Sequence, residues 1–332
     1  MIRHRLVAVL PAALLAAAAL CALPLTAGPA LAASPFPVTA VHVPGGAVLV
    51  TADSRTGTAY VGNGNDGRIT AIRASGSLGA TLHGPCCGEY GLADDPTTRT
   101  VLAAGIDDDL YAVDEATHVA TVIDVAGPLG LGAPGAVAVD PVTGRVYATS
   151  VYDDVVTVAD VVTHQVRARI TLPDQPLQLA VDPLAHKVFL VGGSSVWVVD
   201  ERTNKVTSTV ALGRAGGDVG IDQRSGLVYV TSPQDDTLTE ISVRTARVVG
   251  RVHVDAAHGG TSLAVAVDPQ THLVFVASYD AGAVYVVDGC TLHVVARVHV
   301  GGSPLDVAAS PLTGKVYVVD GSSSVKVISA AP

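Results

Sequence analysis

The sequence predicts an all-β domain made of seven similar four-stranded antiparallel sheets. Three observations predict it: a short motif returns seven times at intervals of forty-odd residues, the segments between turns are short and rich in Val, Thr, Ile and Tyr, and turn-forming residues bound each segment. Such segments favour strands, whereas helical repeats of this length would need long runs of helix formers. Forty-odd residues is the length of one four-stranded propeller blade. We therefore predict a single domain over residues 33–332, a seven-bladed β-propeller.

The recurring motif is a tight turn between the first two strands of each blade. Residues 139–147 read Val-Asp-Pro-Val-Thr-Gly-Arg-Val-Tyr, and residues 267–275 repeat them as Val-Asp-Pro-Gln-Thr-His-Leu-Val-Phe. Pro141 presets φ for a turn and Gly144 can adopt positive φ. The anchor residues that begin the seven copies are Asp53, Asp95, Asp140, Asp182, Asp222, Asp268 and Ser310.

The strand before each anchor alternates between small and bulky residues. The small residues, two positions before the anchors, are Thr51, Ala93, Ala138, Ala180, Gly220, Ala266 and Ala308. The bulky ones, one position earlier, are Val50, Leu92, Val137, Leu179, Val219, Val265 and Val307. Alternate residues of a strand point to opposite faces, so one face is small and the other bulky. Blades that converge on an axis need this asymmetry, which favours a closed ring over a flat solenoid.

The two ends of the chain are expected to close the ring. The seventh unit stops after its third strand, at residues 325–329. Near the other end, residues 37–43 (Pro-Val-Thr-Ala-Val-His-Val) resemble residues 294–300 (Val-Val-Ala-Arg-Val-His-Val), the expected outer strand of the sixth blade. We predict that residues 37–43 complete the last blade, which would leave no open seam in the ring.

These repeats resemble the YVTN family of β-propeller repeats, relatives of NHL-type and lactonase-like propellers. The resemblance rests on residues 222–232 (Asp-Gln-Arg-Ser-Gly-Leu-Val-Tyr-Val-Thr-Ser) and 283–288 (Ala-Val-Tyr-Val-Val-Asp), and it extends over residues 37–329. Ser232 stands where the family has Asn, whereas Asn63 keeps it. The resemblance implies the fold, but such propellers include binding proteins, surface-layer proteins, lactonases and lyases, so it implies no single activity.

The first 32 residues are predicted to be a signal peptide. Arg3 and Arg5 precede an apolar run over residues 6–25, and Ala30-Leu31-Ala32 fits a cleavage site. The alternative is an uncleaved membrane anchor, although two prolines interrupt the run. We expect a secreted monomer with no membrane contact after cleavage. A net charge of −10 without a basic stripe argues against nucleic acid as a partner.

Acidic residues are expected on the face that carries the second-to-third-strand loops and the mouth of the central channel. Asp218, Asp306 and Gln178 stand at the mouth, and Asp153, Asp154, Asp235 and Asp236 lie in the loops. Oxygen ligands of this kind could hold Ca²⁺. The alternative is that they are ordinary solvated carboxylates, because no loop carries an ordered ligand set. We expect no cofactor, with Ca²⁺ as the candidate if one binds.

One histidine and two cysteines also stand out on this face. His258, in the loop Ala257-His258-Gly259-Gly260, is a non-repeated histidine there and could form an acid–base pair with Asp218 or Asp306. Cys86 and Cys87 are adjacent, and export would favour either a vicinal disulfide or a pair of thiols. Cys290 belongs to a turn on the opposite face, so a bridge from the pair to it is not expected.

Two functions fit these observations. The first is an exported, non-catalytic binding or scaffold module whose loop face meets a protein, a glycan or a small ligand. The second is a lactonase- or lyase-like enzyme with a metal ion or a histidine at the channel mouth. Regular blades, short loops and few non-repeated polar residues favour the first.

Overall fold

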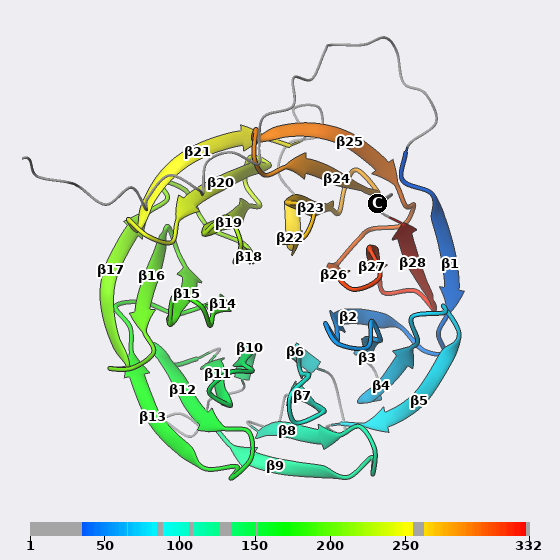
Figure 1. Ribbon diagram of the computed structural model, residues 1–332, viewed down its shortest axis with the longest axis horizontal. Coiled ribbons are helices and arrows are strands. Elements are labelled where there is room, and N and C mark those ends of the chain that lie inside the picture. Colours follow the sequence, from blue (N-terminus) through cyan, green and yellow to red (C-terminus); the bar gives the residue numbers. More distant parts are fainter. Residues whose placement is uncertain are drawn as a thin grey trace, which may run out of the picture. The chain divides into compact units, whose positions relative to one another are not determined.

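The computed structural model describes residues 35–64, 66–84, 89–105, 109–125, 134–150, 152–254 and 262–329. The elements in these ranges are 28 strands, which form seven four-stranded antiparallel sheets with no helix among them. The sheets stand around a common axis like blades (Figure 1). The predicted all-β, seven-bladed propeller is confirmed.

Each of the first six blades uses four strands in chain order, from the axis outwards. Blade 1 contains β2 (Ala47–Ala52), β3 (Ala59–Asn63), β4 (Arg68–Ile72) and β5 (Leu78–His83), and blade 2 contains β6 (Glu89–Asp95), β7 (Thr100–Gly105), β8 (Asp109–Asp114) and β9 (Ala120–Asp124). Blade 3 contains β10 (Pro134–Asp140), β11 (Arg145–Ser150), β12 (Val155–Asp160) and β13 (Val166–Thr171), and blade 4 contains β14 (Gln178–Asp182), β15 (Lys187–Gly192), β16 (Ser195–Asp200) and β17 (Lys205–Ala211). Blade 5 contains β18 (Val219–Asp222), β19 (Leu227–Ser232), β20 (Thr237–Ser242) and β21 (Arg247–His253), and blade 6 contains β22 (Ser262–Asp268), β23 (Leu273–Ser278), β24 (Ala283–Asp288) and β25 (His293–His299).

Blade 7 joins the two ends of the chain. It contains β26 (Asp306–Ser310), β27 (Lys315–Val319) and β28 (Ser324–Ser329), and its outer strand is β1 (Val38–His42). Val38 pairs with Ile328 and His42 with Ser324. The backbone N–H of Val43 extends the ladder by donating to the carbonyl of Ser323 at 2.9 Å. The structure therefore confirms the predicted closure by the N-terminal strand and gives the register of its pairing.

Neighbouring blades pack small residues against bulky ones, as the alternation predicts. Ala93 of blade 2 shares a buried cluster with Val137 of blade 3, and Ala308 of blade 7 shares one with Val50 of blade 1. At Gly220 a Cβ atom would lie 2.9 Å from Cγ2 of Val267 in the next blade. The inner strands are therefore too close for larger side chains on the small face.

The anchor aspartates hold the turns between the first and second strands of the blades. Asp140, which is fully buried, accepts the backbone N–H of Val142 at 2.8 Å and the hydroxyl of Thr143 at 2.6 Å. Gly144 then adopts a φ of 69°. The hairpins that join strands one to two and three to four lie on one face of the ring, called here the turn face. The opposite face, with the loops joining strands two to three and successive blades, is the loop face.

A proline substitution in β1 tests the closure. The N–H of Val43 donates to the carbonyl of Ser323, and the carbonyl of Pro37 accepts the N–H of Ser329. Because hydrogen-bonded residues alternate along an antiparallel strand, the N–H of Thr39 points towards β28 and that of Ala40 points away from the blade. Thr39→Pro is therefore expected to lower the free energy of unfolding by about 1–3 kcal/mol more than Ala40→Pro, because only the first removes a ladder hydrogen bond. Urea denaturation of both variants measures the difference, and equal losses would contradict the pairing.

Candidate functional site

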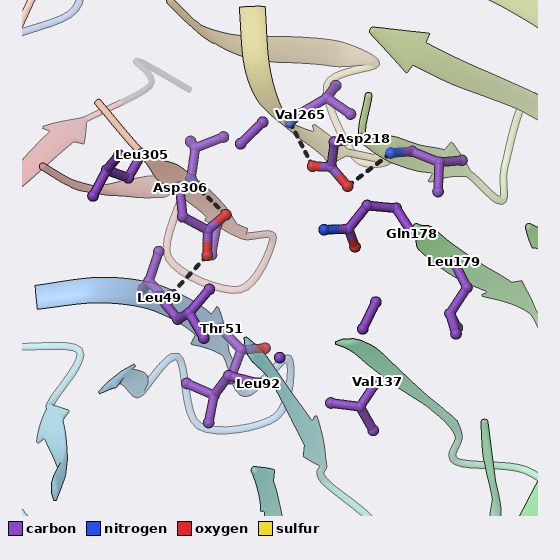
Figure 2. Close-up of a pocket in the computed structure, with 17 residues that line it drawn as sticks. Leu49, Thr51, Leu92, Val137, Gln178, Leu179, Asp218, Val265, Leu305 and Asp306 are labelled. Carbon is purple, nitrogen blue, oxygen red and sulfur yellow. Dashed lines mark hydrogen bonds between the residues drawn. The ribbon is translucent and has the colours of Figure 1, made fainter. Parts of the chain in front are cut away.

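The central channel forms a cavity of about 340 Å³ between the inner strands of all seven blades. Its walls come from the positions four and three residues before the anchors (Figure 2). The first of these rings is Leu49, Gly91, Ala136, Gln178, Asp218, Ala264 and Asp306. The structure thus brings together the three predicted channel-mouth residues Gln178, Asp218 and Asp306.

Asp218 and Asp306 each connect two blades. Asp218 accepts the N–H of Val219 in its own blade at 2.8 Å and that of Val265 in blade 6, also at 2.8 Å. Asp306 accepts the N–H of Val307 at 2.8 Å and that of Val50, in blade 1, at 2.9 Å. Both sets of contacts appear in Figure 2. The carboxylate of Asp306 therefore ties the last blade to the first beside the axis.

Both carboxyls have raised pKa values. Burial raises the pKa of Asp218 to about 6, although the N–H groups of Val265 and Val219 oppose this effect by stabilising the charged form. Burial, with a smaller contribution from the charge of Asp218, raises the pKa of Asp306 to about 7 against the opposing effect of the N–H groups of Val50 and Val307. The channel wall thus changes charge close to neutral pH.

Gln178 of blade 4 is the third polar residue of this ring, after Asp218 of blade 5 and Asp306 of blade 7. Its side-chain amide projects into the same space as the carboxylate of Asp218 (Figure 2). The remaining positions of this ring carry Leu49, Gly91, Ala136 and Ala264. Along this ring the cavity therefore has polar side chains on blades 4, 5 and 7 and apolar residues or glycine on the other four blades, a combination suited to a small ligand with a polar end.

The four loop aspartates are not among the residues that line the channel cavity. Asp153 is buried and one of its carboxylate oxygens has no hydrogen-bond partner, whereas Asp154 is exposed. Asp235 forms an ion pair with Arg214. Asp236 is buried at a φ of 50°, and its carbonyl accepts the N–H of Val254 at 2.8 Å. Asp235 thus binds the segment that joins blades 4 and 5, and Asp236 stabilises blade 5.

His258, Cys86 and Cys87 lie outside the described residues, so their expected roles stay predictions. Cys290 lies in the turn between β24 and β25 and is disulfide-bonded. The other three cysteines all lie outside the described ranges, and the expectations about the Cys86–Cys87 pair therefore remain untested.

A second polar cluster, which the sequence did not indicate, lies between blades 1 and 2 near the turn face. Within the described ranges, no N–H or hydroxyl group donates to either carboxylate oxygen of Asp94 or to Oε1 of Glu115, and the Asp94 and Glu115 carboxyls lie close enough to share a proton. Burial, followed by the charges of Asp53 and Glu115, raises the pKa of Asp94 well above its usual range. Nε of Arg99 lies 3.7 Å from Oε2 of Glu115 and partly offsets the negative charge.

Related clusters lie between blades 3 and 4 and between blades 5 and 6. Glu201 of blade 4 lies close to Asp140 and Tyr147 of blade 3, and it also lies 3.9 Å from Nδ1 of His186 in its own blade. Between blades 5 and 6, Nδ1 of His272 lies 2.5 Å from Oδ2 of Asp222. Burial raises the pKa of Glu201 to about 7. Because the pattern repeats at three interfaces, it reads as blade-to-blade packing rather than as a catalytic centre.

The described residues contain no group of three or more His, Cys, Asp or Glu side chains that could hold a metal ion. They also contain no helix long and apolar enough to cross a membrane.

Comparison with known proteins finds likeness in fold alone. Among solved structures, Kuenenia stuttgartiensis hydrazine synthase matches with a TM-score of 0.77 and 16% identity over 86% of this chain and 96% of that chain. The β-propeller domain of Cps50 (Swd1) from Myceliophteria thermophila matches with a TM-score of 0.75 and 11% identity over 90% of this chain and 100% of that chain. No family model and no curated protein matches the sequence.

Asp94→Asn tests the cluster between blades 1 and 2. Folding raises the pKa of the Asp94 carboxyl, so the folded state binds its proton more tightly than the unfolded state does. The free energy of unfolding therefore falls as the pH rises from the usual carboxyl range to the raised pKa. We expect Asp94→Asn to raise the free energy of unfolding by about 1–3 kcal/mol at pH 8 and to change it little at pH 4. Melting curves at both pH values measure this, with Asp154→Asn as the exposed control. A loss of stability at pH 8 would contradict it.

Proposed function

We propose that the protein is an exported, YVTN-type propeller that acts as a non-catalytic binding or scaffold module at the loop face and channel mouth. The partner class is a protein, a glycan or a small ligand. Export rests on the N-terminal signal pattern, Arg3 and Arg5 before an apolar run and a small-residue cleavage site. Family membership rests on the repeat motif.

The observation that carries the proposal is the way in which the channel carboxylates are held. Asp218 and Asp306 each accept two backbone N–H groups from two blades, at 2.8–2.9 Å. Groups fixed in this way present a preorganised polar wall to a ligand. Gln178, which lies beside Asp218, adds an amide that can both donate and accept.

The alternative is a lactonase- or lyase-like enzyme, and the raised pKa values of Asp218 and Asp306 are the observation that favours it. A carboxyl with a pKa near 7 can act as a general base at neutral pH. Chemistry would also need a partner for that base, which His258 or bound Ca²⁺ would supply. The two functions therefore differ in turnover and in calcium dependence.

Gln178→Ala separates binding from scaffold stability, because within the described ranges the Gln178 side chain forms no hydrogen bond to another blade, unlike Asp218 and Asp306. Glycan arrays and small-ligand thermal-shift screens of the wild type are expected to identify a ligand whose affinity falls about tenfold or more in Gln178→Ala and is unchanged in Asp154→Asn. Hydrolysis of lactones by the wild type above the rate of Asp218→Asn would instead support the enzyme.

Calcium distinguishes the same two functions. A hundredfold excess over the dissociation constant would stabilise the fold by about 2.7 kcal/mol. We expect no calcium-linked rise in the melting temperature. A rise in the wild type that disappears in both Asp218→Asn and Asp306→Asn would contradict the binding-module proposal and favour a calcium-dependent enzyme.

A further inference from the structure

The unpaired basic side chains of this acidic protein gather on one part of the turn face. Five Lys or Arg side chains within residues 35–329 form no ion pair or hydrogen bond, and all five are exposed. They are Arg202, Lys205, Arg224, Arg244 and Arg247, here called the basic patch. All belong to hairpin turns, or to the first strand residue after them, in the adjacent blades 4 and 5 (Figure 1).

The remaining basic side chains in the described residues have partners. Arg68 pairs with Asp66 at 3.2 Å, and Arg167 pairs with Asp160 at 3.0 Å. Others reach backbone carbonyls of a neighbouring blade; Arg251, for example, donates to Leu212 at 3.0 Å. The basic patch therefore differs from the other Lys and Arg side chains of the described residues, which have hydrogen-bond or ion-pair partners.

The acidic groups near the basic patch are buried or already accept hydrogen bonds. Asp182, Glu201 and Asp222 are buried, and Asp222 contacts His272. The carboxylate of Asp200 accepts the hydroxyl and N–H of Thr203 and the N–H of Arg202, which lower its pKa, and the positive charge of Arg202 acts in the same direction. Blade 5 has Ser242 where blades 2, 3, 4 and 6 have Asp at the equivalent turn, so it lacks that counter-charge.

A groove of about 560 Å³ runs between blades 4 and 5 within this region. Its polar walls come from Lys187, Arg244, Ser225 and Ser242, and its remaining walls from small or aliphatic residues such as Ala185 and Gly226. Nζ of Lys187 donates to the carbonyl of Val243 at 2.5 Å. The groove thus presents cations and hydroxyls together.

We propose that the basic patch and this groove bind an acidic polysaccharide, a chain of sugars that carry carboxylates. Guanidinium groups match carboxylates in bidentate geometry, and four of the five patch residues are arginines. The charges are spread over three turns, which suits a ligand with several anionic groups along its length. This surface lies on the turn face, so the proposal is independent of the function assigned to the channel mouth.

The lining of the groove argues for a sugar chain over other polyanions. Single-stranded nucleic acid needs aromatic side chains on which bases stack, and no aromatic residue lines the groove. A protein partner usually anchors an aromatic or aliphatic side chain in an apolar pocket, whereas half of the residues that line this groove are polar: Lys187, Arg244, Ser225 and Ser242. Serine hydroxyls can instead exchange hydrogen bonds with sugar hydroxyls.

Binding of polygalacturonate to the full protein tests the proposal, with fully methyl-esterified polygalacturonate as the uncharged probe. We expect binding of the acid form in about 50 mM salt that weakens about tenfold in about 300 mM salt, because exposed charges are screened. Arg224→Ser/Arg244→Ser is expected to reduce the affinity about tenfold or more. Both side chains are exposed, so the variant should melt at the wild-type temperature.

Arg68→Ser is the matched control, because it removes an exposed arginine from the loop face and should leave the affinity within about twofold of the wild type. Arg224→Lys/Arg244→Lys should retain part of the affinity by keeping the charge. The proposal is overturned if the esterified polymer binds equally well, if the serine variant binds like the wild type, or if poly-glutamate or single-stranded DNA binds more tightly than polygalacturonate.

Discussion

The close approach of neighbouring inner strands at the axis is the constraint on which the rest of the propeller depends. At Gly91 a Cβ atom would lie 2.7 Å from the carbonyl oxygen of Gly135 in the next blade, and Gly220 is similarly crowded by Val267. The same strands carry Asp218 and Asp306, whose carboxylates bond across blade boundaries. The polar wall of the channel is therefore held by the packing that closes the ring, which makes it a rigid surface.

Odd-numbered and even-numbered blades also differ in the residues at equivalent positions. Odd blades place Tyr60, Tyr147, Tyr229 and Tyr317 on the second strand, where even blades have Leu102, Phe189 and Phe275. At the positive-φ position of the first turn, odd blades have glycine and even blades have Arg99, His186 and His272. Interfaces from an odd to an even blade consequently add polar contacts near the turn face to an apolar core, as where His272 contacts Asp222 beside the cluster of Tyr229 and Val274. From an even to an odd blade, Phe189 and Val243 share an apolar cluster.

Much of the fold could be predicted because it repeats. The anchors, the small–bulky alternation and the match between residues 37–43 and 294–300 are local patterns that recur, and each reappears in the structure as a turn, an interface or the outer strand of blade 7. The meeting of Gln178, Asp218 and Asp306 followed from the same register. Because the pattern recurs, the strands and turns assigned in one blade predicted those of the others.

The cluster of Asp94, Glu115 and Asp53 could not be predicted in this way. Its residues come from different positions in two blades. Asp53 is one of the repeated anchors, whereas Asp94 and Glu115 depart from the repeat. Burial and proximity, which only the packed blades supply, raise the pKa of Asp94. The loop aspartates show the converse case, since a run of acids in sequence does not fix where the side chains point. Asp235 turned to Arg214 instead of the channel.

The pairing of β1 with β28 has a consequence for the order in which the chain can fold. Thr39 and Val327 contact each other across a sequence separation of 288 residues. During synthesis β1 is the first of the 28 described strands to emerge, and its partner β28 is the last. Contacts between segments so far apart form late, because the entropy of closing the intervening loop must be overcome first. Until then an edge of blade 7 and the strand β1 stay open to other chains, so the interval before ring closure is the stage most exposed to misassembly.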